Sequence, residues 1–197
     1  GFSSLLAETK HIRLRNELIT TTPARAGVLS PSIVADSPVS GLYLIQFTNR
    51  LDAGWRQELL AAGVELLHYV PDDAFVAHLD QVRLSEIRRR PYVQWLGLFQ
   101  PQHKVHPALL RRIPGQALER FPIKLLARSQ ASNTDMASIV RVLRGTLSYR
   151  TLSMGTLMTG ETDFAGLMAL SRSPAVLWIE GASRMKLLDE VATKILA

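Results

Sequence analysis

Between residues 41 and 182, short apolar runs alternate with stretches whose apolar residues recur at helical spacing. Apolar runs of four to eight residues favour strands, whereas recurrence at i, i+3, i+4 and i+7 favours an amphipathic helix. The order strand, helix, strand, strand, helix, strand occurs over residues 41–100 and again over residues 120–182. The pattern therefore predicts two modules built on one plan.

In the first module the run LYLIQF at residues 42–47 is the first strand. Asp52 is placed to cap the helix that follows, and Gly63 suits the position just after its last turn. Two further strands are expected on either side of Pro71-Asp72-Asp73, residue types that favour a turn. Asp80 is placed to cap a short second helix that Pro91 ends, and YVQWLGLF closes the module as its fourth strand.

The second module begins with the strand FPIKLL at residues 121–126. Thr134 or Asp135 is expected to cap a helix that ends at Gly145. The apolar stripe of this helix comprises Met136, Ile139, Val140 and Leu143. A hairpin of TLSYRTL and GTLMTG follows, then a helix capped by Thr162 or Asp163, stopped by Pro174, and the closing strand AVLWIE.

The phrase Pro-x-Val-x-Trp occurs at Pro91 and again at Pro174, 83 residues later, in a chain with three tryptophans. This internal repeat supports two related modules. The plan β-α-β-β-α-β predicts an α+β fold of two tandem ferredoxin-like modules, each an antiparallel sheet with its helices on one face. Trp95 and Trp178 are expected to anchor the helices to the sheets.

Three segments lie outside the modules. We expect residues 1–40 to be a mostly irregular leader with one short strand near residues 11–19, residues 101–119 to be a linker, and residues 183–197 to be a tail. Ten Lys or Arg residues lie between Arg83 and Arg128, against two glutamates. A basic segment is compatible with nucleic-acid binding, but an exposed helix end and linker explain it more simply.

No catalytic motif is present, so we expect a non-enzyme without cofactor or metal. His103 and His106 stand three residues apart in the linker without nearby carboxylates, and exposed histidines are favoured over metal ligands. Asp72 and Asp73 suit a turn better than acid–base chemistry. The expected central strands lack the aromatic pattern of RNA-recognition modules, which argues against nucleic acid as a partner.

The 197 residues include no cysteine, which excludes disulfides and thiolate chemistry, and no apolar run long enough to span a bilayer. We therefore expect no membrane partner. The residues alone are compatible with a stand-alone protein that binds partners through its two modules. An RNA-binding module is a weaker alternative to that function.

A specific resemblance extends from about residue 12 to the C-terminus. LYLIQF, Trp55, Gly63, YVPDDAF and PYVQWLG with Pro101, followed by AVLWIEGASRMKLLDEVATKIL, resemble the N-terminal pro-region of one group of bacterial subtilisin-like serine proteases. Gly181 stands where that family usually has proline, and LDEVA replaces the commoner NDVA. The protease's own catalytic motifs are absent, so no catalytic residue can be assigned.

The resemblance implies a pro-region that assists folding of a subtilisin-like catalytic domain and inhibits it until processing, in a secreted or cell-envelope precursor. It implies that the open face of a ferredoxin-like sheet packs on two protease helices and that the tail, within Lys186–Ala197, lies in the active-site cleft. The tail's apolar spacing also fits a docked helix, and the two alternatives stay open. The candidate protease-binding residues are Glu161, Asp163, Glu180, Lys194, Ile195, Leu196 and Ala197.

Overall fold

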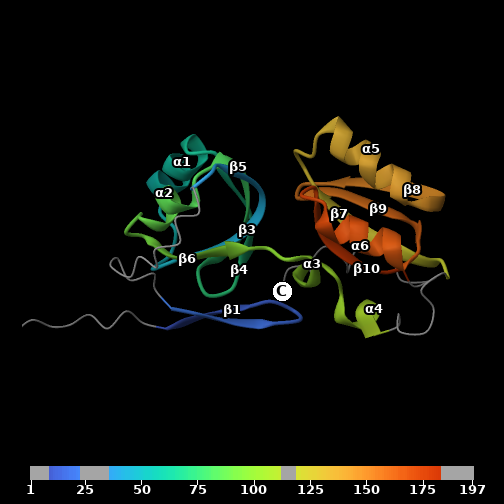
Figure 1. Cartoon of the computed structure of the whole chain (residues 1–197), viewed down its shortest axis with the longest axis horizontal. Coiled ribbons are helices and arrows are strands. Elements are labelled where there is room, and N and C mark those ends of the chain that lie inside the picture. The colour runs from blue at the N-terminus through green and yellow to red at the C-terminus, as the bar shows by residue number, and fades with distance from the viewer. Residues whose placement is uncertain (1–8, 23–35, 112–118, 183–197) are drawn as a thin grey trace, which may run out of the picture. The chain divides into compact units, whose positions relative to one another are not determined.

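The computed structural model describes residues 9–22, 36–111 and 119–182 and divides the chain into two compact units, Gly1–Phe99 and Gln100–Ala197 (Figure 1). Each described unit is built around a four-stranded antiparallel sheet with helices, so the fold is α+β. Within the described ranges, no helix has the length and apolar character needed to cross a membrane.

The sheet of the first unit has the spatial order β4-β5-β3-β6. Its strands are β3 (Val39–Phe47), β4 (Val64–Val70), β5 (Ala74–Val82) and β6 (Val93–Leu98), and its helices are α1 (Ala53–Ala61) and α2 (Leu84–Arg88). Both helices lie on one side of the sheet (Figure 1). Leu59 of α1 and Ile87 of α2 pack there in one buried cluster with Ile45 and Phe47 of β3.

The ends of α1 confirm the sequence prediction. Asp52 is the N-cap, and its carboxylate accepts a hydrogen bond from the Gly54 N–H at 2.7 Å. Gly63 has a φ of 84°, and a Cβ there would lie 2.7 Å from the Asp80 carbonyl oxygen, so only glycine fits this close approach. The predicted cap at Asp80 is wrong, because β5 continues to Val82 and α2 begins after Arg83 without a side-chain cap.

The leader forms an ordered hairpin. Strands β1 (Lys10–Arg13) and β2 (Leu18–Thr21) pair antiparallel, so the expectation of one short strand in an irregular leader is wrong for this stretch. Lys10, Ile12, Ile19 and Thr21 share the less exposed face, whereas the strand residues that alternate with them, His11, Arg13, Leu18 and Thr20, are exposed. The hairpin is therefore amphipathic, and an isolated hairpin of this kind needs a packing partner to be stable.

The second unit repeats the order of the first. Its strands are β7 (Phe121–Arg128), β8 (Arg144–Leu152), β9 (Gly155–Thr162) and β10 (Val176–Gly181), in the spatial order β10-β7-β9-β8. If the four strands of each unit are numbered along the chain, both sheets have the same spatial order. The fourth strand forms one edge beside the first strand, and the second strand forms the other edge. Helices α5 (Asn133–Val142) and α6 (Phe164–Arg172) pack on one face (Figure 1).

The helix stripe predicted in the second unit is confirmed. Ile139 and Leu143 are buried, and Met136 and Val140 pack against them. The cap of α5 is Ser132 rather than Thr134 or Asp135. Ser132 and Asp135 form a capping box in which Asp135 N–H donates to the Ser132 hydroxyl at 3.1 Å, and α5 ends at Val142, before Gly145.

The first part of the predicted linker belongs to the second unit. Helices α3 (Pro101–Lys104) and α4 (Pro107–Arg111) each begin at a proline, which is favoured at the first helical position. Between them, Val105 forms a parallel bridge with Ile179 of β10. Val105 and Leu109 are buried in the core of this unit. The prediction of an exposed linker is wrong for residues 101–111, and residues 112–118 lie outside the described ranges.

The Pro-x-Val-x-Trp repeat has an equivalent place in both sheets. Val93 pairs with Phe47 and Trp95 with Gln46, so one extra residue bulges from β6. Val176 pairs with Ala127 and Trp178 with Leu126, with the same bulge in β10. A bulge inserts one unpaired residue and increases the local twist. The shared bulge extends the internal repeat from sequence to backbone pairing.

Trp95 and Trp178 do not anchor the helices to the sheets, which corrects the sequence prediction. Directly opposite residues in an antiparallel pair point to the same face. Ile45 and Phe47 face the helices of the first unit, so Gln46 and its partner Trp95 face the other side. Leu125 and Ala127 face the helices of the second unit, so Leu126 and Trp178 also point away from them.

Candidate functional site

The sheet face of the second unit that points away from its helices carries two of the predicted site residues. Glu180 of β10 pairs with Lys124 of β7, and Glu161 of β9 pairs with Pro122, so the three charged side chains share this face. Glu161 is exposed, while Lys124 and Glu180 are partly buried. The strand register thus places two predicted carboxylates on one face, Glu180 opposite Lys124 and Glu161 opposite Pro122 on one side and Arg144 of β8 on the other.

Asp163 has a different position and role. It is the N-cap of α6, and its carboxylate accepts a hydrogen bond from the Gly166 N–H at 2.8 Å. This confirms Asp163, and not Thr162, as the cap of the helix. Because its carboxylate already satisfies the N-terminus of its own helix, Asp163 is a poor ligand for the N-terminus of another.

Apolar side chains continue the same face beyond the charged residues. Trp178, Leu126 and Leu157 are all buried, and the Trp178 ring meets His106 edge to face with a centroid separation of 5.9 Å. Trp178 Nε1 donates to Glu180 Oε2 at 3.4 Å. The indole therefore links the buried part of the face to its charged end through one long hydrogen bond.

The remaining predicted site residues, Lys194, Ile195, Leu196 and Ala197, lie outside the described residues, as does the rest of the predicted tail from residue 183. The choice between an extended and a helical tail therefore stays a prediction.

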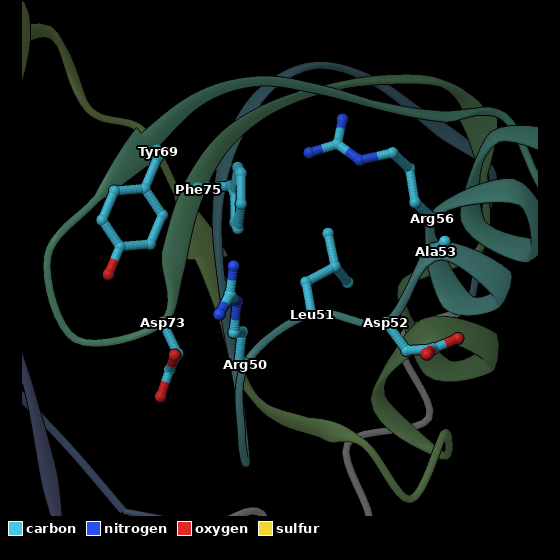
Figure 2. Close-up of a pocket in the computed structure, with 8 residues that line it drawn as sticks. All are labelled: Arg50, Leu51, Asp52, Ala53, Arg56, Tyr69, Asp73 and Phe75. Atoms are coloured by element: carbon cyan, nitrogen blue, oxygen red, sulfur yellow. The ribbon is translucent and has the colours of Figure 1, made fainter.

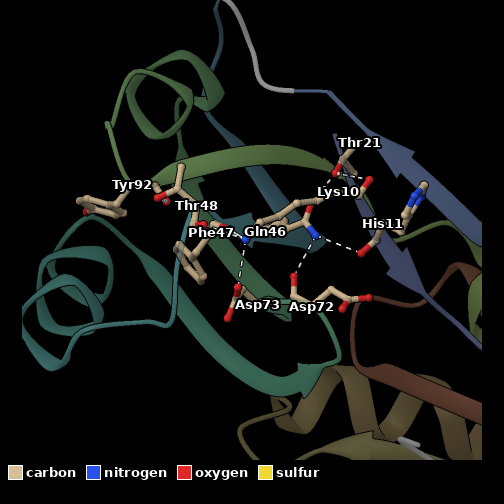
Figure 3. A network of polar contacts seen from close by, with 9 residues as sticks. All are labelled: Lys10, His11, Thr21, Gln46, Phe47, Thr48, Asp72, Asp73 and Tyr92. Atoms are coloured by element: carbon tan, nitrogen blue, oxygen red, sulfur yellow. Dashed lines mark hydrogen bonds and ion pairs between the residues drawn. The ribbon is translucent and has the colours of Figure 1, made fainter. Parts of the chain in front are cut away.

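The equivalent face of the first unit holds the β1–β2 hairpin through a buried glutamine (Figure 3). Gln46 Nε2 donates to the carbonyl oxygens of His11 at 3.1 Å and Asp72 at 2.9 Å. Its Oε1 accepts from the Thr21 hydroxyl. Gln46 is fully buried, so these bonds satisfy an amide that has no access to water.

Lys10 makes a second attachment at the edge of this face (Figure 3). Its ammonium donates to the carbonyl oxygens of Phe47 at 3.1 Å and Thr48 at 2.7 Å, and pairs with Asp73 at 3.0 Å. Asp72 and Asp73 both have positive φ, as expected for the tight turn between β4 and β5. The turn predicted from Pro71-Asp72-Asp73 is therefore confirmed, and both aspartates also serve the hairpin contact.

His68 is a buried titratable group on this face of the first unit. It pairs with Val76 of β5, and its Nε2 atom has no hydrogen-bond partner among the residues that the structure describes. Burial lowers the pKa of His68 below its usual value, because the charged imidazole is poorly solvated there. At neutral pH the ring is therefore neutral.

We expect His68 to weaken the fold in acid. The unfolded chain takes up a proton near pH 6.5 that the folded chain binds only at lower pH, so the free energy of unfolding falls as pH decreases through and below 6.5. His68→Leu should reduce this acid-side loss. Urea unfolding at pH 7.5, 6.5 and 5.5 measures it, with His11→Leu, an exposed histidine, as the control. Equal pH profiles for the wild type and His68→Leu would contradict the assignment.

Lys104 is the second buried titratable group and lies in the segment predicted as a linker. Its ammonium donates to the Ser173 carbonyl oxygen at 2.7 Å, at the C-terminal end of α6. Burial lowers the pKa of Lys104 to about 8. His103 is also buried, and its Nδ1 accepts from the Gln100 N–H at 3.0 Å. The prediction that the linker histidines are exposed is therefore wrong for His103.

Within the described ranges, no three His, Cys, Asp or Glu side chains gather in a way that could hold a metal ion.

The groups that sequence reasoning missed are Gln46, His68 and Lys104. The sequence did indicate that Gln46 is unusual, since it is the one polar residue in the run LYLIQF. The prolines at 101 and 107, with Val105 and Leu109, were a weaker signal of short helices around Lys104.

Residues 13–100 match the family model of a domain of unknown function (DUF8729). The match covers less than half of the chain and ends one residue beyond the first compact unit. It includes β2 of the hairpin, so the matched domain and the hairpin contact overlap. No curated protein and no solved structure matches the chain.

Proposed function

We propose that the chain is the pro-region of a subtilisin-like serine protease and acts as an intramolecular chaperone and inhibitor of the catalytic domain. The supporting observation is that the chain repeats one β-α-β-β-α-β unit with the same strand order and the same bulge beside its Pro-x-Val-x-Trp phrase. We infer that both units are ferredoxin-like, because that order with both helices on one face defines the class.

The second unit is the better candidate for contact with the protease. In the first unit, the hairpin already occupies part of the sheet face that points away from the helices. In the second unit, Trp178, Leu126 and Leu157 of the equivalent face are buried, but the end of this face carries the exposed Glu161 and the partly buried Glu180. Carboxylates at this position are suited to the positive N-termini of partner helices. Asp163 does not belong to this contact, since it caps α6.

Inhibition in trans tests this function. The full chain is added to a subtilisin-like catalytic domain from the same genome, and hydrolysis of a small chromogenic peptide is followed. We expect inhibition with a Ki below about 1 μM, as a standard interface of roughly 1,600 Å² supports such affinity. Refolding of the denatured catalytic domain should also be faster when the chain is present. Absence of both effects at 100-fold excess would overturn the proposal.

The charge contact has its own test. The double variant Glu161→Gln and Glu180→Gln should raise Ki by about tenfold, because two helix-terminal interactions of about 0.7 kcal/mol each are lost. Asp163→Asn is the matched control, since it removes one negative charge but keeps a good N-cap, and it should leave Ki unchanged. If the double variant inhibits as well as the wild type, the docking face is assigned incorrectly even where inhibition itself is observed.

A further inference from the structure

The first unit has a pocket of about 540 Å³ on the helix side of its sheet, where β3 leads into α1 and β4 turns into β5 (Figure 2). The charged and aromatic residues that line it are Arg50, Asp52, Arg56, Tyr69, Asp73 and Phe75. Phe75 pairs with Ile45, which faces the helices, so this pocket lies on the opposite side of the sheet from the hairpin.

Two guanidinium groups in this pocket have no anionic partner in the described part of the chain. Arg50 makes no ion pair there, and Arg56 lies over the Phe75 ring at 5.5 Å from its centroid. In Figure 2 both guanidinium groups point toward Phe75. Arginine groups held beside an aromatic ring favour bidentate binding of a carboxylate.

The acidic residues of the pocket are committed to other contacts. Asp52 accepts from the Gly54 N–H, and Asp73 pairs with Lys10. In Figure 2 their carboxylates point away from the Phe75 ring. The two arginines and Lys10 together with these two carboxylates have a net charge of +1. A singly charged carboxylate therefore suits the pocket better than a doubly charged phosphate.

The aromatic residues provide an apolar surface beside the two cations. Phe75 and Tyr69 meet edge to face with centroids 5.3 Å apart. Tyr69 is 55% exposed, although it is a large aromatic residue, and a phenol hydroxyl can both donate a hydrogen bond to a ligand and accept one from it. Exposed aromatic rings beside arginine are common at the centres of peptide-binding surfaces.

We propose that this pocket binds an acidic peptide segment, in which an Asp or Glu carboxylate bridges Arg50 and Arg56 while an adjacent apolar side chain packs on Phe75 and Tyr69. This binding activity is separate from protease inhibition, since it uses the other side of the sheet in the first unit. Its test contains no protease, so either proposal can fail without the other.

The test is calorimetric titration of the full chain with the blocked peptide acetyl-Ala-Asp-Phe-Ala-amide. We expect saturable binding with a Kd below about 1 mM. The asparagine peptide, acetyl-Ala-Asn-Phe-Ala-amide, should bind at least tenfold more weakly. Inorganic phosphate should compete poorly. Equal binding of both peptides, or displacement by phosphate at a comparable concentration, would overturn the proposal.

Variants then locate the site. Arg50→Ala and Arg56→Ala should each weaken binding of the aspartate peptide at least tenfold. Arg141→Ala, an exposed helix arginine in the second unit, should leave it unchanged. Arg56→Lys keeps the charge but removes the planar fork, so we expect intermediate binding. Both pocket arginines are exposed, and unchanged thermal unfolding of their variants would show that folding is preserved. Equal losses in Arg141→Ala and Arg50→Ala would show that only net charge matters.

Discussion

Gln46→Leu is expected to release the β1–β2 hairpin from the first unit and to lower the free energy of unfolding by about 3 kcal/mol. The substitution leaves the His11 and Asp72 carbonyl oxygens without the amide that donates to both. It also removes one of the two acceptors near the Thr21 hydroxyl, which keeps the Lys10 carbonyl oxygen at 3.1 Å. A buried polar group that loses its partner costs about 1–3 kcal/mol, and leucine offers no replacement.

Hydrogen exchange by mass spectrometry distinguishes release of the hairpin from general loss of stability. In Gln46→Leu, amides of residues 10–21 should exchange at least about tenfold faster, because this short hairpin depends on its contact with the sheet. Peptides from α5 and α6 should be unchanged. Leu126 occupies the equivalent position in the second unit, so leucine itself is compatible with this strand position. Unchanged protection of residues 10–21 would contradict the role of Gln46.

The local elements of the fold were predictable because their signals are local. Asp52 and Asp163 cap their helices as expected, and the stripe through Ile139 and Leu143 faces the core. The repeated Pro-x-Val-x-Trp phrase indicated related units, and both copies have the same strand pairing. These features depend on residues within a few positions of one another, so sequence spacing describes them well.

The faces of the sheets were less predictable because they depend on register between distant strands. A bulge in β6 and in β10 turns Trp95 and Trp178 away from the helices, which composition alone does not reveal. The same register places Glu161 and Glu180 on one face of the sheet, whereas Asp163, only two residues from Glu161, serves a helix cap. Side-chain contacts across long sequence separations, such as that of Gln46 with the hairpin, require the structure.

The burial of Lys104 was not predicted, again because it depends on a contact between residues far apart in the sequence. A cationic residue between two histidines indicates an exposed segment, since lysine is rarely buried without a partner. Here the ammonium reaches Ser173 across 69 residues and donates to the last carbonyl group before Pro174. The negative end of α6 compensates part of the cost of burying the charge. The remaining cost is expressed in the lowered pKa of this group.

The lowered pKa of Lys104 predicts that the protein becomes more stable in mild alkali. The folded chain loses this proton near pH 8, while the unfolded chain keeps it until about pH 10.5. Between these values the unfolded state binds more protons, so the free energy of unfolding rises with pH, by about 3 kcal/mol over the whole interval. Below pH 8 both states are protonated, so Lys104 does not make the free energy of unfolding depend on pH.

Urea unfolding at pH 7.0, 8.0, 9.0 and 9.5 measures the rise in the free energy of unfolding. Lys104→Met should remove it, whereas Lys124→Met, on the sheet of the same unit, should retain it. An equal rise in Lys104→Met and the wild type would show that another group is responsible.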